Sequence, residues 1–307
     1  MQELTIGDVK VAVAQESPFG FLGRLVWYSV RKQRIPQEDF EALCDKEGVP
    51  PEFRPRRTRP IDAFKNAVRS LDGSDYIVEP DIVYDPATGL KTDQKAMIVA
   101  TTKPDRVSNA LPVVLKATFD PVHTTIAYEG SATHLSPRVN QEFDENLASY
   151  RDEDVRKMVV ESIHGAYAFN LKQTGGVYFI PEDHFPTVEP VARVIDQLPG
   201  CEMVSVPVID REPERKTVIR QYEKATLERL GELMEMVKAT IDKGEEIIPS
   251  VYKRFREEAE YITEQREKYE DFLNISMEKV SVEAQALGAY LVRLGTMIRE
   301  DKPATPG

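Results

Sequence analysis

The stretch NLKQTGGVYFIP, residues 170–181, organises this chain, because a long amphipathic segment ends there and a short apolar run begins. Gly175 and Gly176 can adopt the positive φ values that end a helix. Residues 177–180 are typical of a buried strand, which Pro181 ends. Two glycines before a strand could also bind a phosphate, although phosphate loops normally lead into a helix whose free amides face the anion. We favour a structural turn and predict a tight contact or special conformation at Gly176.

The composition predicts a soluble globular protein. The chain has 307 residues, of which 41% are hydrophobic, and a net charge of −12. This length suits roughly two structural units. The sequence has no run of about 18 uncharged apolar residues and no basic-then-apolar start, so we expect a cytoplasmic protein without a membrane partner. Cys44 and Cys201 lack neighbours at metal-ligand spacing, so we expect reduced thiols, no metal and no cofactor.

Residues 1–210 predict one α+β domain. Apolar residues spaced by three and four predict helices over residues 18–34, 36–47 and 61–71, which makes the segment 18–71 helical. The segment 75–210 is expected to form a mixed, mainly antiparallel sheet with flanking helices, since turn-separated strands favour antiparallel pairing. Its predicted strands are 76–84, 96–101, 113–119, 124–128, 177–180 and 203–208, and its predicted helices are 139–150, 153–171 and 188–198.

Two details of this sheet follow from local signals. Pro80 is expected on an edge strand or at a bulge, because proline has no amide to donate to a neighbouring strand. The strand, helix and strand of residues 177–208 predict two strands that run parallel in one sheet, joined by a right-handed crossover.

Three segments carry a resemblance to a known group of proteins. They are LVWYS at residues 25–29, PIDAF at residues 60–64 and GGVYF at residues 175–179. In order and spacing the chain resembles, over residues 20–240, an uncharacterised family of bacterial proteins that is well represented among filamentous actinobacteria. The resemblance implies a shared architecture and assigns no activity to any residue. The chain departs from that pattern by its long C-terminal helices, where a function of its own could lie.

The segment 213–300 predicts a helical coiled-coil or bundle module, and the tail 301–307 is expected to be frayed. Its apolar residues recur every three or four positions, as in helices that pack on one another, and its other faces are rich in Glu, Lys and Arg. Such long stripes would expose too much apolar surface on a single layer of helices. We therefore expect one face to close within the chain and another between copies of the chain, with Leu287, Leu291 and Leu294 at the second.

The densest basic segment of this acidic chain is the candidate nucleic-acid site. It comprises Arg54, Arg56, Arg57, Arg59, Lys65 and Arg69. The planar guanidinium group of arginine suits phosphate, so this segment could contact nucleic acid. The alternative is that its arginines pair with acidic helices of the same chain, because the segment lacks interleaved aromatic residues that would stack on bases.

The remaining candidates for chemistry are His164 and His184. His164 lies on a predicted helix and His184 follows a strand end, so both could face one cleft. An isolated histidine is more often a packing or surface group than a catalytic one. The sequence therefore predicts a non-enzymatic assembly or interaction protein that associates with itself through its C-terminal helices. The alternative is an enzyme with scattered polar residues near His164 and His184.

Overall fold

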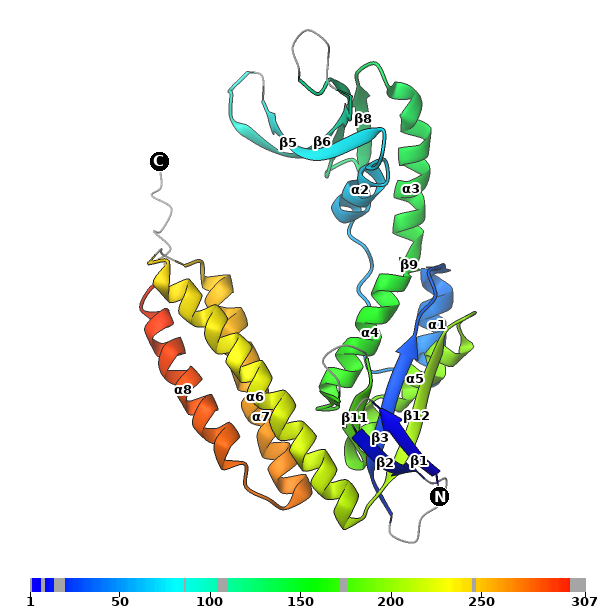
Figure 1. The fold of residues 1–307 in the computed structure, drawn as a ribbon. Helices are drawn as coiled ribbons and strands as arrows, with labels where there is room; N and C mark the ends of the chain where they lie inside the picture. The colour runs from blue at the N-terminus through cyan, green and yellow to red at the C-terminus, as the bar shows by residue number, and fades with distance from the viewer. Residues whose placement is uncertain are drawn as a thin grey trace. The chain divides into compact units, whose positions relative to one another are not determined.

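The computed structural model describes residues 2–6, 9–13, 20–85, 87–103, 110–171, 176–244 and 247–298. The chain divides into two compact units (Figure 1). Unit 1 combines Met1–Val30 with Val159–Gly307, and unit 2 is Arg31–Met158. The predicted helical module at 213–300 therefore clusters with the sheet of unit 1. Gly175 and the predicted frayed tail lie outside the described residues.

Unit 1 is built on an antiparallel sheet. In the described part of the chain, six strands form this sheet in the order β1, β2, β12, β3, β11, β10, and every pairing between them is antiparallel. Because β11 and β12 both pair with β3, they run parallel to each other in one sheet, as predicted, with β3 between them. The strands are β1 Gln2–Ile6, β2 Val9–Val13, β3 Phe21–Ser29, β10 Phe169–Asn170, β11 Tyr178–Pro181 and β12 Glu202–Ile209.

The helix predicted over residues 18–34 is wrong, because strand β3 occupies this segment. Successive side chains of a strand point to opposite faces of the sheet, and the neighbours Leu25 and Val26 are both buried. A strand covered on both faces needs apolar residues at positions of both parities, which imitates the spacing of a helix. The pairing of β3 with β11 and β12 therefore overrode a local pattern that looked helical.

The tight contact or special conformation predicted at Gly176 is also wrong, since Gly176 has no positive φ. A Cβ atom at residue 176 would lie 3.5 Å from the Tyr178 ring, which is an ordinary van der Waals distance. The helix before this stretch, α4 (Asp152–Gly165), ends well ahead of it, and strand β10 intervenes. Gly23, on β3, is by contrast crowded by a neighbouring strand.

The helices of unit 1 cover its sheet and complete its core. α5 (Glu189–Gln197) packs on β12, and the short 3-10 helix η2 (Glu182–Thr187) packs on β3. The long helices α6 (Glu212–Asp242), α7 (Pro249–Leu273) and α8 (Glu278–Gly295) pack on one another, and α6 also contacts β2 and β10. The core that joins sheet and helices includes Leu25, Phe179, Val208, Tyr222, Leu233, Ile262, Tyr269, Leu287 and Leu294.

Unit 2 contains a second antiparallel sheet, in the order β5, β6, β7, β8. Helices α2 (Pro60–Arg69) and α3 (Ser136–Ala148) pack on each other and share a core with this sheet, in which the Phe64 and Phe119 rings stack 5.4 Å apart. The predicted antiparallel strands are confirmed. Their bounds are β5 Tyr76–Tyr84, β6 Lys91–Thr101, β7 Val113–Asp120 and β8 Thr125–Glu129, and the 3-10 helix η1 spans Thr133–Leu135.

Strand β5 is an edge of this sheet, which confirms the prediction for Pro80. Val78 donates its amide to Asp72, and Ile82 donates its amide to Asp81. Pro80, midway between them, has no amide to donate. These features protect an edge strand against pairing with other chains.

Unit 2 also contains a pair of short strands and a further helix. Strands β4 (Arg34–Pro36) and β9 (Ser149–Arg151) pair antiparallel. Helix α1 (Gln37–Glu47) follows β4 directly and ends at Gly48, whose φ of 73° confirms the predicted helix stop. None of the helices in the described ranges is long and apolar enough to cross a membrane.

Candidate functional site

The Arg-rich segment, defined as the six predicted residues Arg54 to Arg69, lies on the loop between α1 and α2 and on α2 itself. Arg57 donates two hydrogen bonds to the Glu41 carboxylate, at 2.8 Å and 2.6 Å. Arg54 forms an ion pair with Asp45 and donates to the Val49 carbonyl at 2.8 Å. Both carboxylates belong to α1, so these two arginines attach the loop to that helix.

The other cations of the Arg-rich segment differ in their surroundings. Arg59 pairs with Asp62 at 2.7 Å, and the Lys65 ammonium lies 3.9 Å from the same carboxylate. Arg56 and Arg69 are exposed, and neither forms an ion pair with any residue that the structure describes. The internal pairing that we weighed against nucleic-acid contact therefore engages four of these side chains, and two remain available for an anion.

Tyr150 of β9 completes the attachment of the loop to α1. Its side chain is buried, and its hydroxyl donates to Glu41 at 2.9 Å and lies 3.3 Å from the Pro55 carbonyl oxygen, which can share the same hydrogen. The hydrogen bonds from Arg57 and Tyr150 lower the pKa of Glu41 to about 2. Sequence reasoning missed this arrangement, because 109 residues separate Tyr150 from Glu41 and no local pattern connects them.

In unit 1 the structure brings His164 and His184 into one aromatic cluster, defined as His164, Tyr167, His184 and Tyr261. The His164 ring stacks on the Tyr261 ring with centroids 3.6 Å apart, and the His184 ring lies 5.1 Å from the Tyr167 ring. The two tyrosine rings are nearly parallel, 6.3 Å apart. Both histidines therefore lie in this cluster, and the ring of each packs against a tyrosine ring.

The electrostatics of this cluster disfavour protonated histidine. Burial and then the nearby Arg229 lower the pKa of His164, and burial and then Lys268 lower the pKa of His184. Within the described residues, no side-chain hydrogen bond joins either ring to a carboxylate, and no group of three or more His, Cys, Asp or Glu side chains could hold a metal ion.

Tyr167, at the centre of the aromatic cluster, has a rare backbone conformation. Its φ of 53° lies in the left-handed region, where a bulky side chain is uncommon. Gln265 of α7, which is buried, donates to the carbonyls of Tyr167 at 2.9 Å and of Ala168 at 2.8 Å. Lys268 lies over the Tyr167 ring. One face of α7 therefore fixes the chain between α4 and β10.

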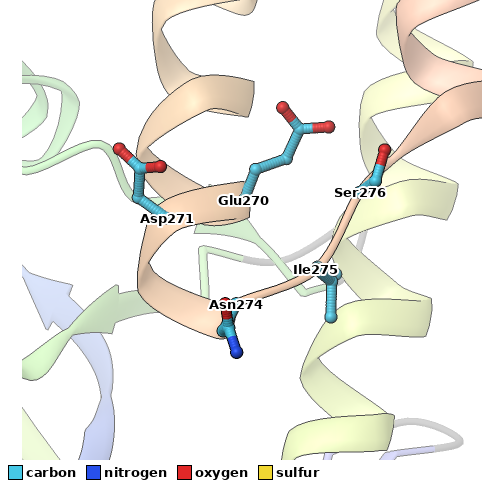
Figure 2. A pocket seen from close by; sticks show the side chains of 5 residues that line it. All are labelled: Glu270, Asp271, Asn274, Ile275 and Ser276. Atoms are coloured by element: carbon cyan, nitrogen blue, oxygen red, sulfur yellow. The ribbon is translucent and has the colours of Figure 1, made fainter.

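A shallow pocket lies at the turn between α7 and α8 (Figure 2). Asn274, with a φ of 53°, ends α7, and the Glu270 carboxylate accepts the Met277 amide at 2.6 Å. Figure 2 shows Glu270 on the side of Ser276 and Asp271 on the opposite side of the helix. Because the two carboxylates diverge, we assign this pocket to the turn that positions the start of α8.

The C-terminal helices place their apolar residues differently from the prediction. Leu287, Leu291 and Leu294, which we expected between copies, are buried within the chain at 1%, 7% and 0% exposure. The large apolar side chains that α8 exposes are Val282 at 63% and Val292 at 73%. The sequence signal for this surface was a run without charges, AQALGAYLV at residues 284–292.

Comparison with known proteins identifies a family for this chain but no relative of known activity. The family model described as "Family of unknown function (DUF6744)" matches residues 21–300. This match includes α6, α7 and α8, so the C-terminal helices belong to the family pattern and are no addition particular to this chain. No curated protein and no solved structure matches the chain.

Proposed function

We propose that this chain, which belongs to the family of unknown function DUF6744, is a non-enzymatic assembly protein that associates with itself through the outer face of α8. The observation that carries the proposal is the exposure of Val282 and Val292 on a helix whose middle has no charged residue. Both side chains point away from the buried residues Leu287, Leu291 and Leu294 of the same helix.

The uncharged run of α8 extends around the whole circumference of the helix. An α-helix makes a turn every 3.6 residues, so the run at 284–292 covers about two and a half turns and includes the solvent side. A helix on the surface of a bundle normally carries charged or polar residues on that side, as α6 and α7 do, whereas a helix that is uncharged all round is normally buried. The outer face of α8 therefore has the composition of an interface.

Two further parts of the proposal concern partners and location. Nucleic-acid contact is proposed only for Arg56 and Arg69 of the Arg-rich segment, because the other four cations have carboxylate partners. A cytoplasmic location in a bacterium is proposed from the composition and from the resemblance of residues 20–240 to actinobacterial proteins. A catalytic use of His164 and His184 is disfavoured, since tyrosine rings pack against both.

The experiment is sedimentation velocity on the full-length protein at roughly tens of micromolar, about ten times a micromolar dissociation constant. We expect wild-type dimers at this concentration. A single helix face is smaller than a standard stable interface, so the association should be weak and a high protein concentration is needed to detect it. The double variant Val282→Asp, Val292→Asp should be monomeric with an unchanged circular dichroism spectrum, since both side chains are exposed.

A matched control shows whether loss of the dimer is specific to the α8 face or follows from placing Asp at any exposed apolar position. Met236 of α6 is 50% exposed, so Met236→Asp makes the same chemical change on another helix of the bundle and should leave the dimer intact. Aspartate at Leu287 would instead unfold the helical core, because it buries a charge without a partner. Wild-type protein that sediments as a monomer would reject the proposed function.

A further inference from the structure

We infer that the second copy packs on α8 in the antiparallel direction, about a two-fold axis near residue 287. This inference rests on the proposed function and adds the geometry of the contact and the residues that face each other. Each copy would present the same surface to the other, as in the commonest type of homodimer interface. The occupant of the α8 face is therefore a second copy of this chain.

The spacing of the two exposed valines fits such an axis. Val282 and Val292 lie five residues on either side of residue 287, and Gln285 and Ala289, which are also exposed, lie two residues on either side. An antiparallel pair centred there places Val282 of each copy against Val292 of the other. It also places Gln285 opposite Ala289, so the small side chain faces the long one. The surface is thus complementary to itself when one copy is reversed.

The charges at the ends of the α8 face favour the same direction. Glu278, in the first turn, and Arg293, in the last turn, are both exposed, and neither forms an ion pair within the described ranges. An antiparallel pair brings Glu278 of one copy to within three residues of the position that faces Arg293 of the other, about 4.5 Å along the axis, whereas a parallel pair opposes like charges. The macrodipoles of the two helices also attract when the helices run in opposite directions. Lys279 and Glu283 lie one turn apart on the flank and balance each other in charge.

Paired cysteines distinguish the two directions. In a parallel pair, residue 282 faces its own copy, so Val282→Cys alone should form a disulfide between chains on oxidation. In the antiparallel pair, the two copies of residue 282 lie ten residues apart along the axis, about 15 Å at 1.5 Å per residue. That separation exceeds the roughly 7 Å that a disulfide spans between Cα atoms.

The experiment mixes two single variants in a Cys201→Ser background, where Cys44 is buried. We expect Val282→Cys and Val292→Cys to form a disulfide-linked dimer when mixed, with each protein carrying a tag of different mass, and neither to do so alone. Cross-linking of each variant alone would overturn the antiparallel geometry and leave the proposed function standing. A wild-type dimer without any of these cross-links would overturn the α8 contact itself, and a wild-type monomer would overturn both proposals.

A charge exchange provides an independent readout that needs no oxidation. Glu278→Arg should weaken the dimer about two- to fivefold, as expected for an exposed ion pair, because residue 278 lies within one helical turn of the position that faces Arg293 of the second copy. The double variant Glu278→Arg, Arg293→Glu should restore the wild-type dissociation constant. The absence of restoration, with both proteins folded, would overturn the pairing of these two residues.

Discussion

Gly23 and Ile180 lie so close across strands β3 and β11 that a Cβ atom at residue 23 would be 2.3 Å from the Ile180 carbonyl oxygen. The same atom would lie 2.6 Å from the tip of the Phe179 ring. Gly23 is paired with Pro181 on one side and with Val208 on the other, in the middle of the six-stranded sheet. Close approach of β11 to β3 therefore depends on the missing side chain.

We predict that Gly23→Ala destabilises the protein. The added methyl group meets backbone that cannot move without disturbing the sheet, and overpacking of this kind costs about 1–3 kcal/mol. Chemical denaturation measures the free energy of unfolding of the variant and the wild type. Equal stability of the two would contradict the close approach of β11 to β3.

Gly231 provides the matched control, because it lies exposed on α6 and a Cβ atom added there would meet no other atom within 4 Å. Gly231→Ala should raise the free energy of unfolding by about 0.5–1 kcal/mol, since alanine loses less backbone entropy in a helix. The same substitution thus has opposite signs at the two positions.

The buried amide of Gln265 leads to a second prediction. Gln265→Leu removes the donor that both Tyr167 and Ala168 carbonyls use, and Tyr167 is then left in a left-handed conformation without that support. An unsatisfied buried polar group costs about 1–3 kcal/mol, so we expect a loss of that size in denaturant unfolding.

Gln141, which is exposed on α3 and donates to Glu145, is the control for this change. Gln141→Leu should alter stability by less than about 0.5 kcal/mol, as is usual for a surface substitution. Similar losses at the two positions would show that the carbonyls of Tyr167 and Ala168 do not depend on Gln265.

The third prediction concerns the pH dependence of unit 2. Glu41 has an ordinary pKa of 4.5, which the structure lowers to about 2. Because the folded pKa lies below the unfolded one, the contribution of this carboxylate to stability is complete above pH 4.5 and is lost as the pH falls towards 2. Arg57→Gln removes the largest cause of the shift, so the pKa of Glu41 should return towards 4.5.

A titration of the Glu41 carboxyl group followed by NMR measures this directly. We also expect the difference in unfolding free energy between wild type and Arg57→Gln to shrink as the pH is lowered through this range. Titration of wild-type Glu41 near 4.5 would show that the hydrogen bonds from Arg57 and Tyr150 do not persist in solution.

A fourth prediction separates the two kinds of arginine in the Arg-rich segment. If Arg56 and Arg69 contact phosphates, replacing both with Gln should reduce the slope of log K against log salt concentration by about 1.4–1.8, at about 0.7–0.9 for each contact. Their replacement should leave stability unchanged, because neither side chain pairs with a described residue. Arg57→Gln, in contrast, should lower stability, since it loses both hydrogen bonds to Glu41.

Salt-dependent binding to single- and double-stranded oligonucleotides, followed by fluorescence anisotropy, tests this prediction. A wild-type protein that binds none of them at low salt would end the nucleic-acid hypothesis for this segment. An unchanged slope in the double variant would assign any observed binding to other residues.

Features that depend on short-range pattern could be predicted from the residues alone. The hairpin of β5 and β6 follows from alternating apolar residues on both sides of a turn sequence at residues 85–89, and the end of α1 follows from Gly48. The long helices after residue 213 follow from apolar spacing sustained over many turns. In each case the decisive residues lie within a few positions of one another, so local chemistry selects the structure.

For the candidate sites, the sequence showed which types of side chain were present but not which partners they would contact. Arg57 was a reasonable phosphate ligand until the fold placed Glu41 beside it, and His164 was an unpaired histidine until α7 placed Tyr261 against its ring. The partners come from distant positions of the chain, and the strength of such contacts depends on distance and burial. Neither quantity can be read from spacing along the sequence.

Periodicity and turn residues act locally, so the order of residues was enough to specify the α+β class, the antiparallel hairpins and the helical C-terminal segment. Long-range packing selected a strand for residues 21–29, since only neighbours on both edges and cover on both faces favour that state over a helix. Packing also selected the side of α8 that faces water. Residues 284–292 of that helix carry no charge, and the packing of α6 and α7 against Leu287, Leu291 and Leu294 leaves Val282 and Val292 exposed.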